Sequence, residues 1–181
     1  MQKKCLFSSE RPGFRSWLND DLDEVAELNA DPQVVEHFPS TLSRGETADF
    51  IDRLIAHFNR HGYSYFAVEV IDTGELIGFI GLAYQTYGVS FLPATVMGWR
   101  LKQTAWGKGY ATEDAKRCLE FDFQKLKLER VVSTCTLSNQ NSENVMRKIG
   151  LIKMGEFDHP RPSASPGHER CVWYEVKKSL S

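Results

Sequence analysis

Apolar residues recur along the chain with two different periods, which separate predicted helices from predicted strands. Between residues 43 and 62 the period is helical. Ser43 followed by Glu46 three residues later is typical of a capping box, and Gly62 is placed to end the helix. An earlier helix is expected to open at Asp20 or Asp21 with a similar acidic capping pattern and to end near residues 31–32.

Two further helices follow in the second half of the chain. One begins after a glycine-rich loop and places Ala111, Ala115, Cys118, Leu119 and Phe123 on one face. The other is short, spans residues 139–149, and has a glycine at position 150 to end it.

Alternating or β-branched runs predict the strands. They are expected at residues 14–17, 63–71, 75–84, 94–101, 129–137, 151–157 and 171–176. The turn at residues 72–74 makes a hairpin, and the strand-helix-strand unit around the glycine loop favours one parallel pair. The expected fold is therefore α+β, a mixed and mostly antiparallel sheet with flanking helices, in one domain over residues 1–181.

Composition excludes several classes of protein. The net charge of −2 gives no sign of nucleic-acid or membrane binding. The cysteines are scattered without a C-x-x-C pair, which argues against a zinc site or a redox motif, and no metal is expected. The chain shows neither a signal peptide nor an apolar run of about 20 residues, so a cytoplasmic location is expected.

The loop from Gln103 to Ala111 carries the functional argument. A glycine-rich junction between a strand and a helix points free N–H groups and the positive end of the helix dipole at an anion. Arg100, Lys102 and Lys108 are expected to add charge near a phosphate. The loop has neither the G-x-x-x-x-G-K-[ST] motif nor the third glycine of the dinucleotide fingerprint, and a bare G-x-G could equally be a simple turn.

The residues around this loop resemble a known family. Met97-Gly98-Trp99-Arg100-Leu101, then Trp106-Gly107-Lys108-Gly109-Tyr110-Ala111-Thr112-Glu113, resemble the acyl-CoA-binding motif of GNAT acetyltransferases. About thirty residues on, Asn139-x-x-Ser142-x-x-Val145-x-x-Lys148-x-Gly150-Leu151 is similar to a second motif of the branch that contains the ribosomal-protein N-terminal (RimJ/RimL-type) acetyltransferases.

The resemblance implies acetyl-CoA as co-substrate and direct attack by an amine, without a protein nucleophile. The pantetheine of acetyl-CoA is expected to pair with the backbone of residues 99–101, and an N–H of residues 98–100 to stabilise the oxyanion. The implied cofactor-binding residues are Trp99, Arg100, Leu101, Thr104, Trp106, Gly107, Lys108, Gly109, Tyr110, Ala111, Thr112, Asn139 and Ser142.

Three residues are candidates for the chemistry. Ser142 is expected to hydrogen-bond the departing thiolate, or alternatively to cap its helix. Glu69 and His159 are the candidate bases, although Glu69 is equally read as a solvated strand residue and His159 as a loop anchor. Water-mediated or substrate-assisted deprotonation has equal standing with either base.

The chain departs from the family pattern at three positions. Thr104 stands where Arg or Gln is often found, Leu151 replaces an aromatic residue, and Val96 stands where many relatives carry a glutamate that can act as base. Val96 keeps open a CoA-binding sensor without turnover.

The acceptor expected from the resemblance is a protein N-terminal amine. The alternative is a small molecule such as a polyamine, amino acid or aminoglycoside, and a homodimer is compatible with either. Three loops are expected to choose the acceptor, at residues 32–42, 85–93 and 159–169.

Overall fold

A computed structural model describes residues 5–160 and 169–178. Eight strands form one sheet in the order β1-β2-β3-β4-β5-β6-β8-β7. The strands are β1 (Cys5–Ser8), β2 (Pro12–Arg15), β3 (Tyr65–Val70), β4 (Leu76–Gln85), β5 (Ala94–Leu101), β6 (Arg130–Thr136), β7 (Ile152–Asp158) and β8 (Arg170–Lys177).

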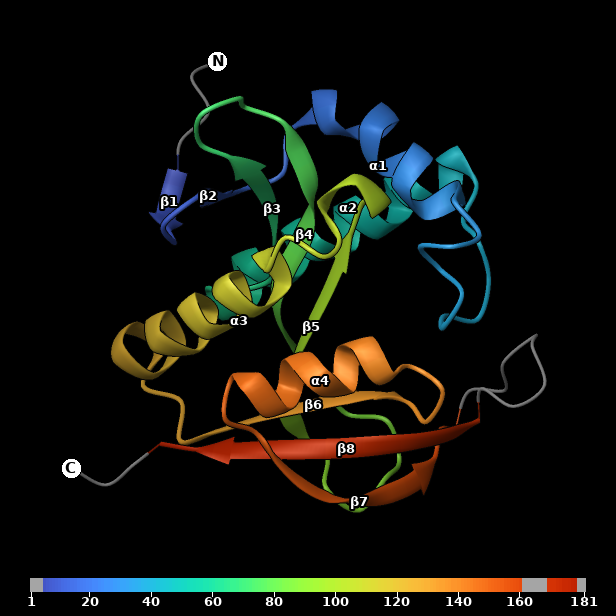
Figure 1. The fold of residues 1–181 in the computed structure, drawn as a ribbon, viewed down its shortest axis with the longest axis vertical. Coiled ribbons are helices and arrows are strands. Elements are labelled where there is room, and N and C mark those ends of the chain that lie inside the picture. The colour runs from blue at the N-terminus through green and yellow to red at the C-terminus, as the bar shows by residue number, and fades with distance from the viewer. Residues whose placement is uncertain (1–4, 161–168, 179–181) are drawn as a thin grey trace.

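Helices cover both faces of the sheet (Figure 1). The α-helices are α1 (Leu22–Ala30), α2 (Arg44–His61), α3 (Tyr110–Phe121) and α4 (Gln140–Lys148), with short 3₁₀ turns η1 (Asn19–Asp21) and η2 (Gln103–Ala105) and a π-helical turn η3 (Asp122–Leu126). The core residues of α1 and α2 form one cluster, and those of α3 and α4 pack with the opposite face of the sheet. The fold class expected from sequence is confirmed.

Local signals explain most element boundaries. The Ser43 hydroxyl accepts the N–H of Glu46, the Glu46 carboxylate accepts the N–H of Ser43, and Gly62 ends α2 with a φ of 79°. β5 begins with four consecutive buried residues, and its bounds match the expectation.

Two local expectations were wrong, and a third lies largely outside the described residues. The strand expected at residues 14–17 ends at Arg15, and β1, which was not expected, precedes it. The acidic capping box of α1 does not form, because the Asp21 carboxylate instead accepts from the Leu18 N–H and binds Arg15. Of the acceptor-choosing loop expected at residues 159–169, positions 161–168 lie outside the described residues.

Candidate active site

β5 and β6, the two parallel strands at the centre of the sheet, diverge after a short paired segment. β5 and β6 are paired only at Val96 with Val132 and at Met97 with Ser133. Beyond Met97, β5 stays paired with β4 on its other side as far as Leu101. Its edge toward β6 is therefore left open for another extended chain, as the sequence predicted for residues 99–101.

Two adjoining chambers lie where β5 and β6 diverge. The sheet chamber, of about 400 Å³, is lined by His37, Phe38, Pro39, Phe50, Tyr65, Phe79, Gln85, Val96, Met97, Gly98, Trp99, Arg100, Ser133, Thr134, Cys135, Thr136, Asn139, Ser142, Met146, His159 and Cys171. The loop chamber, of about 590 Å³, is lined by Gln33, Val34, Glu36, His37, Phe38, Trp99, Arg100, Leu101, Ala105, Trp106, Gly107, Gly109, Tyr110, Ala111, Thr112, Asn139, Asn141, Ser142, Asn144, Val145 and Lys148. Six residues line both, so the chambers are two parts of one cleft.

The glycine loop presents backbone amides at the loop chamber. Gly107 and Gly109 have φ of 71° and 85°, a conformation that side chains disfavour, and a Cβ at Gly107 would meet only open space. The first helical hydrogen bond of α3 runs from Glu113 N to Gly109 O, so the N–H groups of the three preceding helical residues lie before it. Amides and helix dipole together make this end of the cleft an anion site.

The positive side chains near the loop differ from expectation. Lys102 Nζ pairs with Glu24 at 2.8 Å, and Arg100 lies against Phe38. The Arg11 guanidinium contacts the loop: it donates to Lys108 O, lies 4.4 Å from the Tyr110 ring centroid and pairs with Glu113 at 2.6 Å. Arg11 was missed because it lies in the β1–β2 turn, about a hundred residues from the loop in sequence.

Most of the predicted cofactor residues meet in the loop chamber. Thr104 and Lys108, which are both exposed, do not line it. Those that do line it are Trp99, Arg100, Leu101, Trp106, Gly107, Gly109, Tyr110, Ala111, Thr112, Asn139 and Ser142.

Asn139 and Ser142 lie where the two chambers join. Asn139 is the N-cap of α4: its Oδ1 accepts the N–H of Ser142 at 3.0 Å. The cap that the sequence allowed for Ser142 thus belongs to Asn139. The Ser142 side chain lines both chambers.

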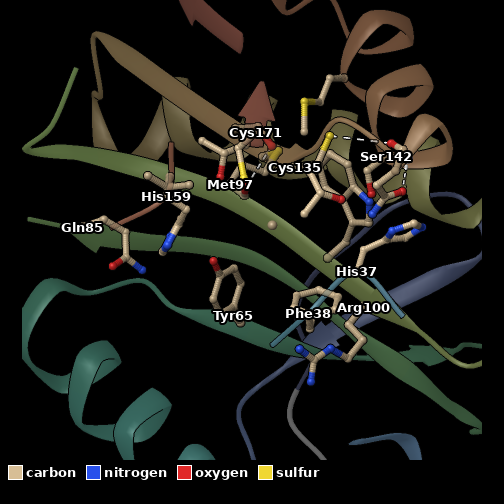
Figure 2. A pocket seen from close by; sticks show the side chains of 18 of the residues that line it. His37, Phe38, Tyr65, Gln85, Met97, Arg100, Cys135, Ser142, His159 and Cys171 are labelled. Carbon is tan, nitrogen blue, oxygen red and sulfur yellow. Dashed lines mark hydrogen bonds between the residues drawn. The ribbon is translucent and has the colours of Figure 1, made fainter. Parts of the chain in front are cut away.

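The sheet chamber has an aromatic and largely uncharged interior. Figure 2 shows Tyr65, Phe38 and Arg100 along one side, with His159 and Gln85 opposite. A Cβ at Gly98 would lie 3.0 Å from the Tyr65 hydroxyl, so the glycine makes room for this ring. Burial raises the pKa of Tyr65 to about 12, which keeps the phenol protonated as a hydrogen-bond donor.

Comparisons with known proteins agree with this architecture. A family model described as an acetyltransferase (GNAT) domain matches residues 11–152. The chain belongs to the GNAT acetyltransferase family. It is 31% identical over 153 residues to the uncharacterized N-acetyltransferase YnaD of Bacillus subtilis, covering 83% of this chain and 84% of that protein.

Solved GNAT structures share the fold. An acetyltransferase of the GNAT family from Bacillus anthracis superposes with a TM-score of 0.77 and 26% identity, covering 94% of this chain and 96% of that one. RimL, a ribosomal L7/L12 α-N-protein acetyltransferase in complex with coenzyme A, gives a TM-score of 0.79 at 16% identity and covers 96% and 98% of the two chains. This enzyme is thus a GNAT N-acetyltransferase by family and fold.

The two candidate bases of this GNAT protein lie in different places. His159 lines the sheet chamber, with its ring centroid 4.8 Å from that of Tyr87. Glu69 lines neither chamber, and its Oε1 accepts from Arg15 Nη2 at 2.6 Å. The alternation of β3 places Glu69 on the same face as Tyr65, but only Tyr65 reaches the cleft.

The position where relatives carry a glutamate is apolar here. Val96 is 6% exposed and lines the sheet chamber beside β6, within the cluster of Phe91 and Val132. This position therefore offers the chamber a packed apolar side chain and no carboxylate.

The loop after α1 was recognised only as a candidate acceptor loop. Its residues His37 and Phe38 line both chambers, and His37 Nδ1 is hydrogen-bonded to Ser138 Oγ at 3.2 Å. The loop thereby reaches across the cleft to the segment before α4. Only a hydrophobic pair in a polar loop, Phe38-Pro39, could have indicated this role in the sequence.

Other types of site find no support in the described part of the chain. Within residues 5–160 and 169–178, no three His, Cys, Asp or Glu side chains gather as metal ligands. Nor does any helix in these ranges combine the length and apolarity needed to cross a membrane.

Proposed function

We propose that this enzyme transfers an acetyl group from acetyl-CoA to the α-amine of an acceptor bound in the sheet chamber. This proposal rests on one observation: β5 and β6 diverge, and the glycine loop lies at one end of the cleft between them. The open strand edge suits the pantetheine amides, and the amides of residues 107–112 suit a diphosphate.

In this proposal the amine attacks the thioester carbonyl within a ternary complex. A bond forms between the amine nitrogen and the carbonyl carbon, the carbon–sulfur bond breaks, and the amine proton passes to a base. A backbone N–H among residues 98–100 stabilises the charge on the carbonyl oxygen. Ser142 donates a hydrogen bond to the departing sulfur, a role that its place at the junction of the chambers supports.

His159 is the proposed base, directly or through water. It lies in the sheet chamber, and histidine is the side chain whose ordinary pKa lies closest to neutral pH. The pKa of an N-terminal α-amine is about 8 and that of a lysine about 10.4, so a weaker base can deprotonate the α-amine. With Val96 in place of a carboxylate, the chamber favours an α-amine over a polyamine or aminoglycoside.

The acceptor is then the N-terminal amine of a protein or a free amino acid. The likeness to RimL supports the first, but at 16% identity it extends to the fold alone. A non-catalytic sensor finds less support, because the Ser142 and His159 side chains both line the sheet chamber.

Thiol release from acetyl-CoA tests the reaction. We expect release with N-terminal peptides or amino acids, and little with spermidine or kanamycin at the same concentration. CoA binding with no release in the presence of any amine would refute the catalytic proposal in favour of a sensor. Turnover restricted to spermidine or kanamycin would refute the α-amine.

The glycine loop is tested separately by calorimetric CoA binding. Gly107→Val and Gly109→Val should each weaken CoA binding at least tenfold, because the side chain strains the loop and blocks approach of the diphosphate. Gly74→Val is the matched control: it has the same kind of backbone strain, φ of 69°, in a turn that lines neither chamber. Equal CoA affinity in all three folded variants would refute the loop's assignment.

A further inference from the structure

Arg15 and Arg100 both have little solvent exposure. Arg15 is paired with carboxylates, whereas Arg100 is not paired with any in the described part of the chain. Arg15 is 3% exposed and has two carboxylate partners, Asp21 at 2.7 Å and Glu69 at 2.6 Å. Burial alone would lower the pKa of Arg15, but its hydrogen bonds to these carboxylates outweigh burial and raise it. Its charge is therefore fully matched inside the fold.

Arg100 has no such match among the residues that the structure describes. Its Nη1 donates to the neutral side chain of Asn29, with 2.5 Å between Nη1 and Oδ1, and its Nε is buried without a hydrogen-bond partner. The guanidinium lies 4.0 Å from the ring centroid of Phe38 and 5.4 Å from that of Phe79. Burial lowers the pKa of Arg100 to about 10, which still leaves it cationic at neutral pH.

The sheet chamber, into which Arg100 opens, has no acidic side chain among its lining residues. Figure 2 shows Arg100 beside Phe38 on the same side of this chamber as Tyr65. A cation held in an apolar surround is costly unless an anion pairs with it. The acidic residue Glu36 lines the loop chamber only, so in the sheet chamber a ligand is the remaining source of that anion.

We propose that the acceptor carries a carboxylate close to its amine, and that Arg100 binds this carboxylate in the sheet chamber. The inference rests on the proposed function, since it names the class of acceptor for the same site. Aromatic walls formed by Phe38, Phe50 and Phe79 would take an apolar side chain of the acceptor.

The spacing of the strand suits such an acceptor. Arg100 and Gly98 point to the same face of β5, about 7 Å apart along the strand. The carboxylate at Arg100 thus places the amine toward Gly98, where the Tyr65 hydroxyl also lies. A polyamine would instead bring positive charge next to an unmatched cation.

Two acceptors that differ in a single group provide the test. Phenylalanine and 2-phenylethylamine share an amine and a ring, and only the first has a carboxylate. The ratio of their kcat/KM values should be at least ten in the wild type, and Arg100→Gln should reduce this ratio at least tenfold. Arg44→Gln, which changes an arginine exposed on α2, is the control and should keep the ratio.

Peptides identify the source of the carboxylate. Met-Asp-Ala and Met-Asn-Ala, both blocked as C-terminal amides, differ only in the acidic side chain that follows the N-terminal residue. A preference for the Asp peptide over both the Asn peptide and phenylalanine would assign the carboxylate to a protein N-terminus. A preference for phenylalanine would assign it to a free amino acid.

Binding separates this inference from the proposed reaction. With CoA present, N-acetylphenylalanine should bind at least tenfold more tightly than N-acetyl-2-phenylethylamine, and Arg100→Gln should remove the difference. This result without thiol release from any amine would keep the anionic subsite and refute the proposed reaction. Equal binding of the two ligands, or equal loss of both in Arg100→Met and Arg100→Gln, would refute the subsite.

Discussion

The role open to Ser142 depends on which residue caps its helix. Ser142 becomes available to the cleft because Asn139 takes over the capping of α4. Both residues belong to a motif that is visible in the sequence. Which of them caps the helix depends on the backbone at the start of α4, where spacing alone allowed either reading.

Replacing Ser142 with alanine should separate catalysis from structure. We expect Ser142→Ala to lower kcat about a hundredfold, because the departing sulfur loses its hydrogen bond, while the melting temperature changes little. Asn139→Ala should lower the free energy of unfolding by about 1 kcal/mol, since it removes the cap. Steady-state kinetics and thermal melts of both variants check this. An unchanged kcat in Ser142→Ala would contradict its role.

The site residues that sequence could not supply are those contributed by separate segments. His37 and Phe38 come from the loop after α1, and Tyr65 from β3, yet all three meet in the sheet chamber. The glycine loop and the second motif could be predicted because each is continuous in the chain. A chamber wall assembled across the fold has no such local signature.

At the scale of elements, α3 carries an unmatched acidic group on its buried side. It continues into the π-helical turn η3, whose first residue, Asp122, is 2% exposed and has an Oδ2 without a hydrogen-bond partner among the described residues. The position is also near the negative end of the helix dipole. Burial raises the pKa of Asp122 from 3.8 to about 8.

This shift makes stability depend on pH. Between pH 3.8 and about 8 the folded state keeps a proton on Asp122 that the unfolded chain releases, so the contribution of Asp122 falls as pH rises. The Asp122→Asn variant has no carboxyl group at this position, so its stability does not fall with pH for this reason. Its free energy of unfolding relative to wild type should therefore rise by about 1.4 kcal/mol per pH unit between pH 5 and 7. Urea unfolding across this range checks the slope, and a difference independent of pH would contradict it.

The expected elements were mostly found because their apolar periods are strong. α2 combines a capping box with a regular buried face, and β5 is a run of residues of which five are buried. β1 was missed because it is a four-residue strand at the edge of the sheet with one buried residue, which gives almost no periodic signal. The acidic start of α1 was misread because Asp21 meets Arg15 across space.

At the scale of the whole molecule, the group formed by Arg15, Asp21 and Glu69 joins β2, β3 and the entry to α1. This group lies outside the cleft and connects the layer of α1 and α2 to the sheet. Its three members come from segments up to 54 residues apart. Glu69 is therefore a structural residue in this arrangement, and sequence alone could not distinguish it from a base.

Glu69→Gln should change stability and leave the chemistry intact. Loss of the charged hydrogen bond to Arg15 is expected to lower the free energy of unfolding by about 1–3 kcal/mol. The pH profile of kcat should keep its shape, because the carboxylate lines neither chamber. A large fall in kcat with an unchanged melting temperature would restore Glu69 as the base.

Beyond Met97, the edge of β5 toward β6 offers main-chain groups, which every amino acid except proline supplies alike. Substitutions along this edge leave its hydrogen-bonding groups in place, whereas substitutions in the aromatic walls of the sheet chamber alter what fits there. The enzyme can therefore acquire a new acceptor by changing a few side chains without rebuilding the support for its acyl donor.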